Sequence, residues 1–266
     1  MISVNIKELT VLQFANLKVF AELDHFSTTR LKGNSSGNYN SLNLGYNSGD
    51  LPDNVLSNRI TLFDALDVTE ANFIFPRQTH TATIKVITPE FFELSTEDQY
   101  TYLDETDAVI TDMKEVYVAI KTADCVPVLL YDPCHGVVAA IHAGWRGTVQ
   151  NIVSLTTNTM VERYSTNPSD LWAGIGPSIS PAVYEVGEEV WSQFDSQFYN
   201  ETNPPRADKR LLDLWKANYH QLINSGIRDC QIEVAQICTW ANPDLFFSAR
   251  REGAKTGRMA TGIRLR

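Results

Sequence analysis

Two short apolar segments joined by a tight turn constrain the fold more than any other part of the sequence. Residues 126–131 (VPVLLY) and 136–141 (GVVAAI) are rich in β-branched side chains, and the turn sequence DPCHG covers residues 132–136. A proline early in such a turn and a glycine late in it are typical of a hairpin. The pattern therefore predicts an antiparallel β-hairpin, with a further apolar strand over residues 116–121.

The remaining patterns place helices around grouped strands. Apolar spacing predicts a helix over 148–164 with Thr148 as its N-cap, a short helix over 187–194, and a helix opened by Asp213 and closed by Gly226. Further strands are expected over 81–87, 171–175, 232–237 and 259–265, and a polar loop over 200–209. Because the strands are grouped instead of alternating with helices, we expect an α/β fold, a single-domain mixed-sheet sandwich with flanking helices over residues 1–266.

Composition excludes several classes of partner. The chain has 22 basic and 32 acidic residues, a net charge of −10, whereas nucleic-acid binding requires clustered Lys and Arg. No segment approaches the ~20 apolar residues of a membrane span, and the first residues lack the pattern of a signal peptide. We therefore expect a cytoplasmic protein that binds neither nucleic acid nor membrane. Composition does not indicate the oligomeric state.

The hairpin brings a cysteine close to a histidine. With a four-residue loop, Asp132 faces Val137, and Cys125 faces Gly144 and lies diagonal to His142 on the same face. A two-residue loop places Cys125 directly opposite His142, and only the intermediate register puts them on opposite faces. Zinc binds both thiolate and imidazole, and a catalytic zinc site uses three protein ligands.

His80 is the preferred third ligand. It lies just before the strand expected over 81–87, whereas His135 is in the far turn and His220 is inside a helix. The gaps of 45 and 17 residues match no compact zinc motif, and a lone histidine is also a common structural polar residue. None of the four cysteines forms a Cys-x-x-Cys pair, so each is a free thiol or a ligand.

Other common catalytic motifs do not occur. The chain has no Gly-x-Ser-x-Gly elbow, no phosphate loop ending in Gly-Lys-Ser/Thr, and neither element of the base-deaminase signature. The turn over 144–148 (GWRGT) allows two interpretations. Its backbone amides and Arg146 could bind an anion at a helix N-terminus, or Arg146 could be an ordinary surface group.

Eight short segments in fixed order resemble one known family. They are residues 41–45 (SLNLG), 78–80 (QTH), 106–108 (TDA), 122–127 (TADCVP), 141–147 (IHAGWRG), 176–179 (GPSI), 246–252 (FFSARRE) and 256–259 (TGRM). From about Phe26 to the C-terminus, the chain resembles the YfiH/YlmD-like family, also called the multicopper polyphenol oxidase or laccase-domain family. The sequence departs from the family pattern at Thr79, at Thr81 and over residues 32–36.

The resemblance implies a metal site of His80, Cys125 and His142, the residues that the hairpin argument also selects. It further implies purine nucleoside chemistry: phosphorolysis of adenosine, inosine and 5'-methylthioadenosine, and deamination of adenosine. Nucleoside and phosphate are then the substrates. Zinc is the expected cofactor, with copper possible in the same site, and it would lower the pKa of a bound water to ~7.

Roles for individual residues follow from this hypothesis. The expected catalytic residues are Cys125, Asp124 as acid/base or as a histidine partner, and Arg146 beside phosphate. The expected substrate-binding residues are Asn43, Arg30, Arg59 and Gln78. Two alternatives stay open: a copper-dependent polyphenol oxidase and a non-enzymatic metal-stabilised binding module. Five histidines are too few for the copper centres of a blue multicopper laccase.

Overall fold

The expected hairpin is present in the computed structural model, which describes residues 1–200 and 206–266. Strands β8 (Val126–Asp132) and β9 (Val137–Ala143) pair in antiparallel fashion, with Asp132 opposite Val137. This pairing confirms the register of the four-residue loop. Residues 201–205 of the expected polar loop lie outside the described part of the chain.

The described strands form two six-stranded sheets and a small ribbon. The first sheet has the order β1-β2-β3-β14-β7-β4 and the second the order β13-β10-β8-β9-β6-β5. In the first sheet the new strands are β1 (Ile2–Ile6), β2 (Leu9–Gln13), β3 (Leu23–Thr28), β14 (Met259–Leu265), β7 (Tyr117–Thr122) and β4 (Phe73–Ile74). The second adds β13 (Ile232–Val234), β10 (Trp172–Ile175), β6 (Ala108–Thr111) and β5 (Ile84–Ile87), and the ribbon pairs β11 (Glu185–Gly187) with β12 (Lys209–Leu211).

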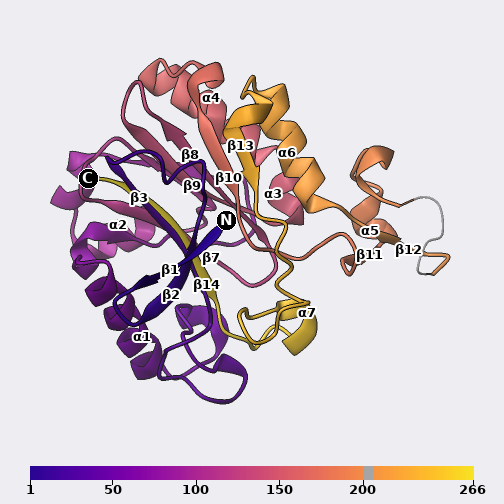
Figure 1. Cartoon of the computed structure of the whole chain (residues 1–266), viewed down its shortest axis with the longest axis horizontal. Helices are drawn as coiled ribbons and strands as arrows, with labels where there is room; N and C mark the ends of the chain where they lie inside the picture. Colours follow the sequence, from indigo (N-terminus) through magenta and orange to yellow (C-terminus); the bar gives the residue numbers. More distant parts are fainter. Residues whose placement is uncertain (201–205) are drawn as a thin grey trace.

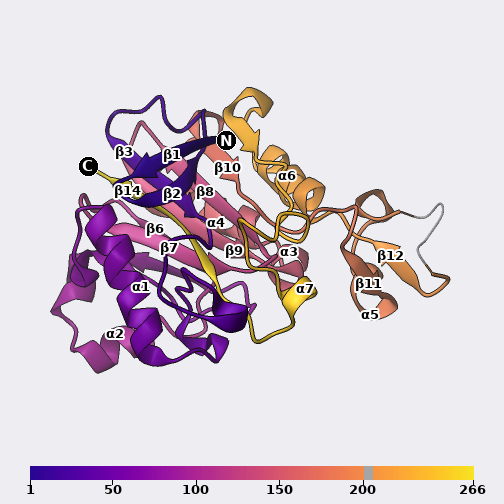
Figure 2. The same cartoon turned by 60° about the horizontal axis from the view of Figure 1, so that its bottom comes forward.

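The core is arranged in four layers, visible in Figures 1 and 2. Side chains such as Val118 of β7 and Leu129 of β8 fill the space between the two sheets. Helix α1 (Pro52–Ala65) packs on the outer face of the first sheet, and α4 (Ile152–Tyr164) and α6 (Leu214–Asn224) pack on that of the second. The expected mixed-sheet α/β sandwich with flanking helices is therefore confirmed.

The helix expected over 148–164 is instead two helices, α3 (Trp145–Val149) and α4. Asn151 separates them with a φ of +60°, a left-handed conformation that asparagine tolerates better than most residues. Thr148 is therefore not an N-cap, and its hydroxyl donates to the Gly144 carbonyl inside α3. By contrast, Asp213 caps α6 as expected, because its carboxylate accepts from the Lys216 amide.

The remaining described helices are short. They are α2 (Thr96–Tyr102), α5 (Glu188–Trp191) and α7 (Ala249–Glu252), with 3₁₀ segments η1 (Gly37–Tyr39), η2 (Tyr46–Ser48), η3 (Glu70–Asn72), η4 (Pro89–Glu93), η5 (Pro168–Asp170), η6 (Ser196–Phe198) and η7 (Asp229–Gln231). The β11–β12 ribbon and α5 extend away from the sandwich (Figures 1 and 2). Within residues 1–200 and 206–266, no helix has the length and apolarity to cross a bilayer.

Termini of four neighbouring strands meet at one end of the second sheet. Strand β6 runs parallel to β5 and antiparallel to β9, and β8 is antiparallel to β9. The first residues of β5, β6 and β8 therefore lie at the same end of the sheet as the last residues of β9. Residues just before these strand starts or at the end of β9 are brought together by the topology alone.

Candidate metal centre

Three side chains of metal-binding types converge at this end of the second sheet. His80 precedes β5, Cys125 immediately precedes β8, and His142 is the next-to-last residue of β9. Their nearest ligand atoms all lie within 4.8 Å of one another, and the Cys125 Sγ is 3.8 Å from the His80 Nε2. The two imidazole rings are edge to face, with centroids 4.9 Å apart.

Asp107 organises both histidines. Its carboxylate accepts from the His142 Nδ1 at 2.6 Å, which leaves the His142 Nε2 free to face the cysteine. The same carboxylate accepts from the backbone amides of His80 and Thr81, so it also holds the loop that carries the first histidine. A carboxylate bonded to the outer nitrogen of a ligating histidine fixes its tautomer and orientation.

The donor set fits a tetrahedral metal ion. Zinc with bonds of about 2.3 Å to sulfur and about 2.0 Å to nitrogen would hold those atoms roughly 3.5 Å apart, close to the observed 3.8 Å. Gly144 lines the same space, and a Cβ there would lie 3.1 Å from both the Cys125 Sγ and the His80 Cδ2. The absence of a side chain at residue 144 therefore keeps the space between the three ligands open.

The charges of this centre stabilise one another. Burial opposes ionisation of the Cys125 thiol, but the charges and hydrogen bonds of His142 and His80 lower its pKa to about 6. Burial also opposes a charge on His142, whereas Cys125 and Asp107 raise its pKa to about 9. Burial of Asp107 is likewise outweighed, mainly by His142, and its pKa falls to about 2. The thiolate, the form of cysteine that binds metals, is therefore favoured.

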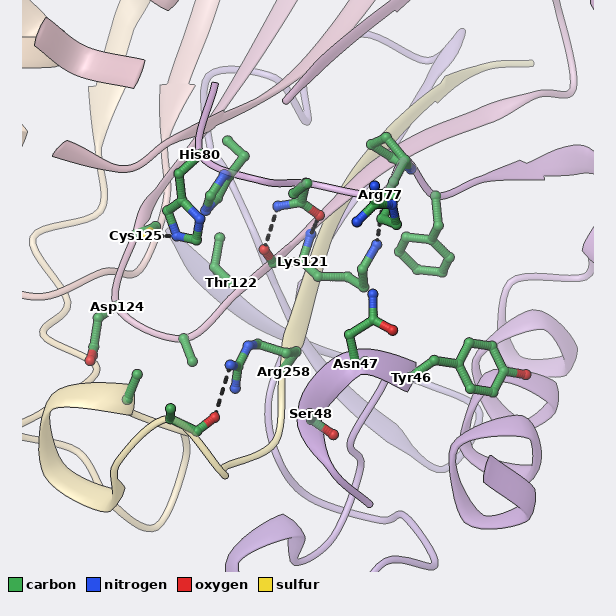
Figure 3. A pocket seen from close by; sticks show the side chains of 18 of the residues that line it. Tyr46, Asn47, Ser48, Arg77, His80, Lys121, Thr122, Asp124, Cys125 and Arg258 are labelled. Atoms are coloured by element: carbon green, nitrogen blue, oxygen red, sulfur yellow. Dashed lines mark hydrogen bonds between the residues drawn. The ribbon is translucent and has the colours of Figure 1, made fainter. Parts of the chain in front are cut away.

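The metal centre opens into a cavity of about 730 Å³. The cavity is lined by the end of β7, by η2, by residues in and near α7, and by Cys125, His80 and His142. Figure 3 shows His80 and Cys125 on one side of it and Lys121, Asn47 and Tyr46 on the other. Its volume lies within the range of ordinary small-molecule sites.

Two of the expected site residues line the cavity, and the polar atoms of both form hydrogen bonds with other parts of the chain. The Gln78 amide donates to the Lys121 carbonyl and accepts from the Lys121 amide, so it ties the His80 loop to β7. Asp124 points away from His80 and Cys125 in Figure 3. Its carboxylate accepts from the hydroxyls of Thr239 and Ser248 and from a backbone amide in α7. None of these three contacts is to a metal-centre histidine, so the geometry favours a positioning role for Asp124.

Of the other expected residues, only Arg59 lines the cavity. Arg30 pairs with Glu252 and stacks on Phe247, and the side chain of Asn43 is buried in a hydrogen-bond network that includes Asp50. Arg146 lies over the ring of Trp145. The roles expected for Arg30, Asn43 and Arg146 therefore stay predictions.

Sequence reasoning assigned no role to Asp107 or Lys121. Asp107 lies in one of the eight family-like segments, directly before an apolar strand, which was the available signal. It could have been recognised only if β6 were known to pair with β9. Lys121 carried no signal beyond its place at the end of an expected strand.

Comparisons with known proteins give matches over nearly the whole chain. Residues 24–266 match the family described as multi-copper polyphenol oxidoreductase laccase. The chain is 40% identical to a protein of Bacteroides thetaiotaomicron named purine nucleoside phosphorylase, over 99% of this chain and 98% of the relative. It is 36% identical to adenosine deaminase RL5 from an unknown prokaryotic organism, over 96% and 98% of the two chains.

The fold is shared with a solved relative. The crystal structure of YlmD from Geobacillus stearothermophilus superposes with a TM-score of 0.88 at 31% identity and covers 97% of this chain and 96% of that one. The resemblance to YfiH/YlmD-like proteins is thus confirmed. The chain belongs to the multi-copper polyphenol oxidoreductase laccase family, and the curated relatives that it resembles are named as enzymes.

Proposed function

We propose that the chain is a zinc-dependent purine nucleoside phosphorylase that accepts adenosine, inosine and 5'-methylthioadenosine and also deaminates adenosine. The observation that carries the proposal is the convergence of His80, Cys125 and His142 at the wall of a cavity large enough for a nucleoside. The names of the relatives supply the substrate class.

The cavity walls suit a purine. Tyr46, Phe75, Tyr100 and Tyr184 all line the cavity. Aromatic rings provide flat apolar surfaces on which a purine base can stack. The open position of a three-ligand site, together with this apolar surface, supports catalysis more than a purely structural metal.

The two reactions make different demands on the chain. Phosphorolysis breaks the bond between base and ribose and transfers the ribose to phosphate, which gives the free base and ribose 1-phosphate. Deamination replaces the amino group at C6 of adenine with oxygen from water and releases ammonia. A zinc ion held by the three ligands would supply Lewis-acid chemistry. Cys125 and His142 orient that site because Asp107 and the hairpin fix them.

A paired measurement tests the proposal. Metal content is determined by elemental analysis of the purified protein, and adenosine is incubated with and without phosphate before chromatography. We expect about one zinc per chain. We also expect adenine and ribose 1-phosphate only when phosphate is present, and inosine from deamination in both incubations.

Two outcomes would contradict this proposal. Copper in the site, with oxidation of a phenol and no turnover of nucleosides, would support the polyphenol oxidase that the family description names. Bound metal without any reaction would support a metal-stabilised binding module. The cytoplasmic location expected from the sequence stays a prediction.

A further inference from the structure

A buried arginine and a half-buried lysine line the cavity beside the metal centre. The Arg59 guanidinium lies between two aromatic rings, 4.3 Å from the centroid of Tyr46 and 4.6 Å from that of Phe75. The Lys121 ammonium lies 4.8 Å from the centroid of the same Phe75 ring. Arg59 is 9% exposed, so little water reaches its charge.

No carboxylate neutralises this pair. Among the described residues, neither Arg59 nor Lys121 forms an ion pair with an acidic group. Glu70 and Asp107 act on them only at longer range, and Asp107 is already bonded to His142. Buried charges in proteins are normally paired, because removing them from water is costly. Burial, with Arg59 adding to it, lowers the pKa of Lys121 well below its usual range.

Both side chains keep hydrogen-bond donors free. Arg59 uses its Nε and one Nη2 hydrogen on the Leu44 carbonyl, and no described partner accepts from its Nη1. Among the described residues, the Lys121 ammonium donates only to the Pro76 carbonyl, at 2.8 Å. By contrast, the Arg258 guanidinium in the same cavity already donates to three backbone carbonyls.

The geometry of the pair suits an oxyanion. The two rings and the Leu44 carbonyl hold the guanidinium in one orientation before any ligand arrives. A planar guanidinium and an ammonium that contact the same Phe75 ring and line the same cavity provide donors of the kind that bind a phosphate group. Lys121 faces the cavity on the side where Asn47 lies (Figure 3). A bound anion would offset both the burial and the mutual repulsion of the two cations.

We propose that Arg59 and Lys121 form an oxyanion site that takes a phosphate group. Two sources have this chemistry: inorganic phosphate and the 5'-phosphate of a nucleotide. That the anion is the second substrate of phosphorolysis rests on the proposed function, whereas the binding of phosphate does not. The proposal also moves the expected anion site away from Arg146, which does not line the cavity.

Calorimetric titration of inorganic phosphate into the purified protein tests the site without any activity. Lys121→Met keeps the contact with Phe75 but removes the ammonium, and Arg59→Gln removes the guanidinium. We expect each variant to weaken phosphate binding at least about tenfold, the usual value of a hydrogen bond to a charged group. Circular dichroism verifies folding, and Lys121→Met carries the test if Arg59→Gln does not fold.

Two other arginines provide matched controls. Arg77 lines the same cavity but is half exposed and paired with Asp104. Arg146 is the rival anion site. Arg77→Gln and Arg146→Gln should therefore bind phosphate within about twofold of the wild-type chain. Loss of binding in Arg146→Gln alone, unchanged affinity in both test variants, or no binding of phosphate by the wild-type chain would overturn the proposal.

Competition distinguishes the two sources of phosphate. If inorganic phosphate is the ligand, it binds together with adenosine. If the site takes a nucleotide, adenosine 5'-monophosphate displaces inorganic phosphate; both results need Arg59 and Lys121. Phosphate binding at the pair without adenosine turnover would contradict the phosphorylase and leave the oxyanion site intact. Phosphate-dependent turnover of adenosine, with unchanged phosphate affinity in both variants, would support the phosphorylase and contradict the oxyanion site.

Discussion

The two ends of the β8–β9 hairpin carry the same kinds of residue and differ in what those residues can do. One end has Cys125 and His142 with Asp107, and the other has Cys134 and His135 with Asp132. At both ends a buried carboxylate accepts a hydrogen bond from a histidine Nδ1, at 2.6 Å for His142 and 2.9 Å for His135. Composition and local hydrogen bonding therefore do not distinguish the ends.

The two ends of the hairpin differ in their burial and in the number of potential metal ligands that meet there. The side chain of His142 is 4% exposed, whereas that of His135 is 40% exposed and Cys134 is exposed beside it. Among the described residues, a third potential ligand joins only the first end: His80, from the loop before β5. Within the described residues, the group at this end is the one found with three potential ligand atoms close together. A metal centre thus depends on where strand ends meet, and residue types alone do not produce one.

Removing the cysteine should have the largest effect on metal binding. Cys125→Ala leaves two ligands, so we expect metal content below about a tenth of the wild-type value after the same dialysis. Nucleoside turnover should be lost with it, while the fold is largely kept. Cys134→Ala at the other end should keep full metal content. Elemental analysis measures both variants, and equal loss in the two would refute the distinction between the ends.

The two carboxylates allow a more selective comparison. Asp107→Asn should weaken metal affinity about 10- to 100-fold, because the His142 tautomer and the His80 loop lose their acceptor. Asp132→Asn disturbs a similar set of bonds to the amides of Cys134 and His135. It should cost about 1–3 kcal/mol of unfolding free energy and leave metal affinity unchanged.

Competition with a chelator gives the metal affinity, and urea denaturation gives the stability. If Asp132→Asn weakened metal binding as much as Asp107→Asn, the effect would be a general loss of hairpin stability. The role assigned to Asp107 in orienting the ligands would then be wrong.

The hairpin could be predicted because it depends on local sequence, whereas its register was left open among a few alternatives until the pairing of Asp132 with Val137 was known. The turn sequence limits the loop length, and the alternation of strand faces then places Cys125 near His142. The α3–α4 break was missed because Asn151 adopts a left-handed conformation within a continuous apolar pattern. Apolar periodicity does not report the backbone conformation of a single residue.

The parts of the site that depend on distant strands could not be derived from the sequence. The choice of His80 needed the family resemblance as support, since no local rule places the start of β5 beside β8 and β9. Asp107 and the Arg59–Lys121 pair became apparent only when α1, β6 and β7 were placed in space. Arg30 and Asn43 were expected to bind substrate, and the structure places both in hydrogen-bond or ion-pair contacts outside the cavity lining, so their binding roles stay predictions.

The two glycines of the hairpin provide the finest comparison. Gly144 has an extended backbone (φ −69°, ψ 171°) that alanine adopts freely, so any effect of Gly144→Ala is steric. Its Cβ would lie 3.1 Å from the Cys125 Sγ and from the His80 ring. Displacing these ligands should cost about 1 kcal/mol, roughly a fivefold loss of metal affinity with little change in apo stability.

For Gly136→Ala we expect the opposite result, a loss of stability without a loss of metal affinity. Gly136 has a φ of +62°, and a Cβ at this residue would have no atom within 4 Å, so Gly136→Ala meets no steric contact but adopts a strained backbone. We expect it to lose about 1 kcal/mol of unfolding free energy and to keep wild-type metal affinity. Chelator competition and urea denaturation of both variants separate the two effects. A loss of metal affinity in Gly136→Ala would mean that the turn controls the ligands through the strands, and that the two ends of the hairpin are not independent.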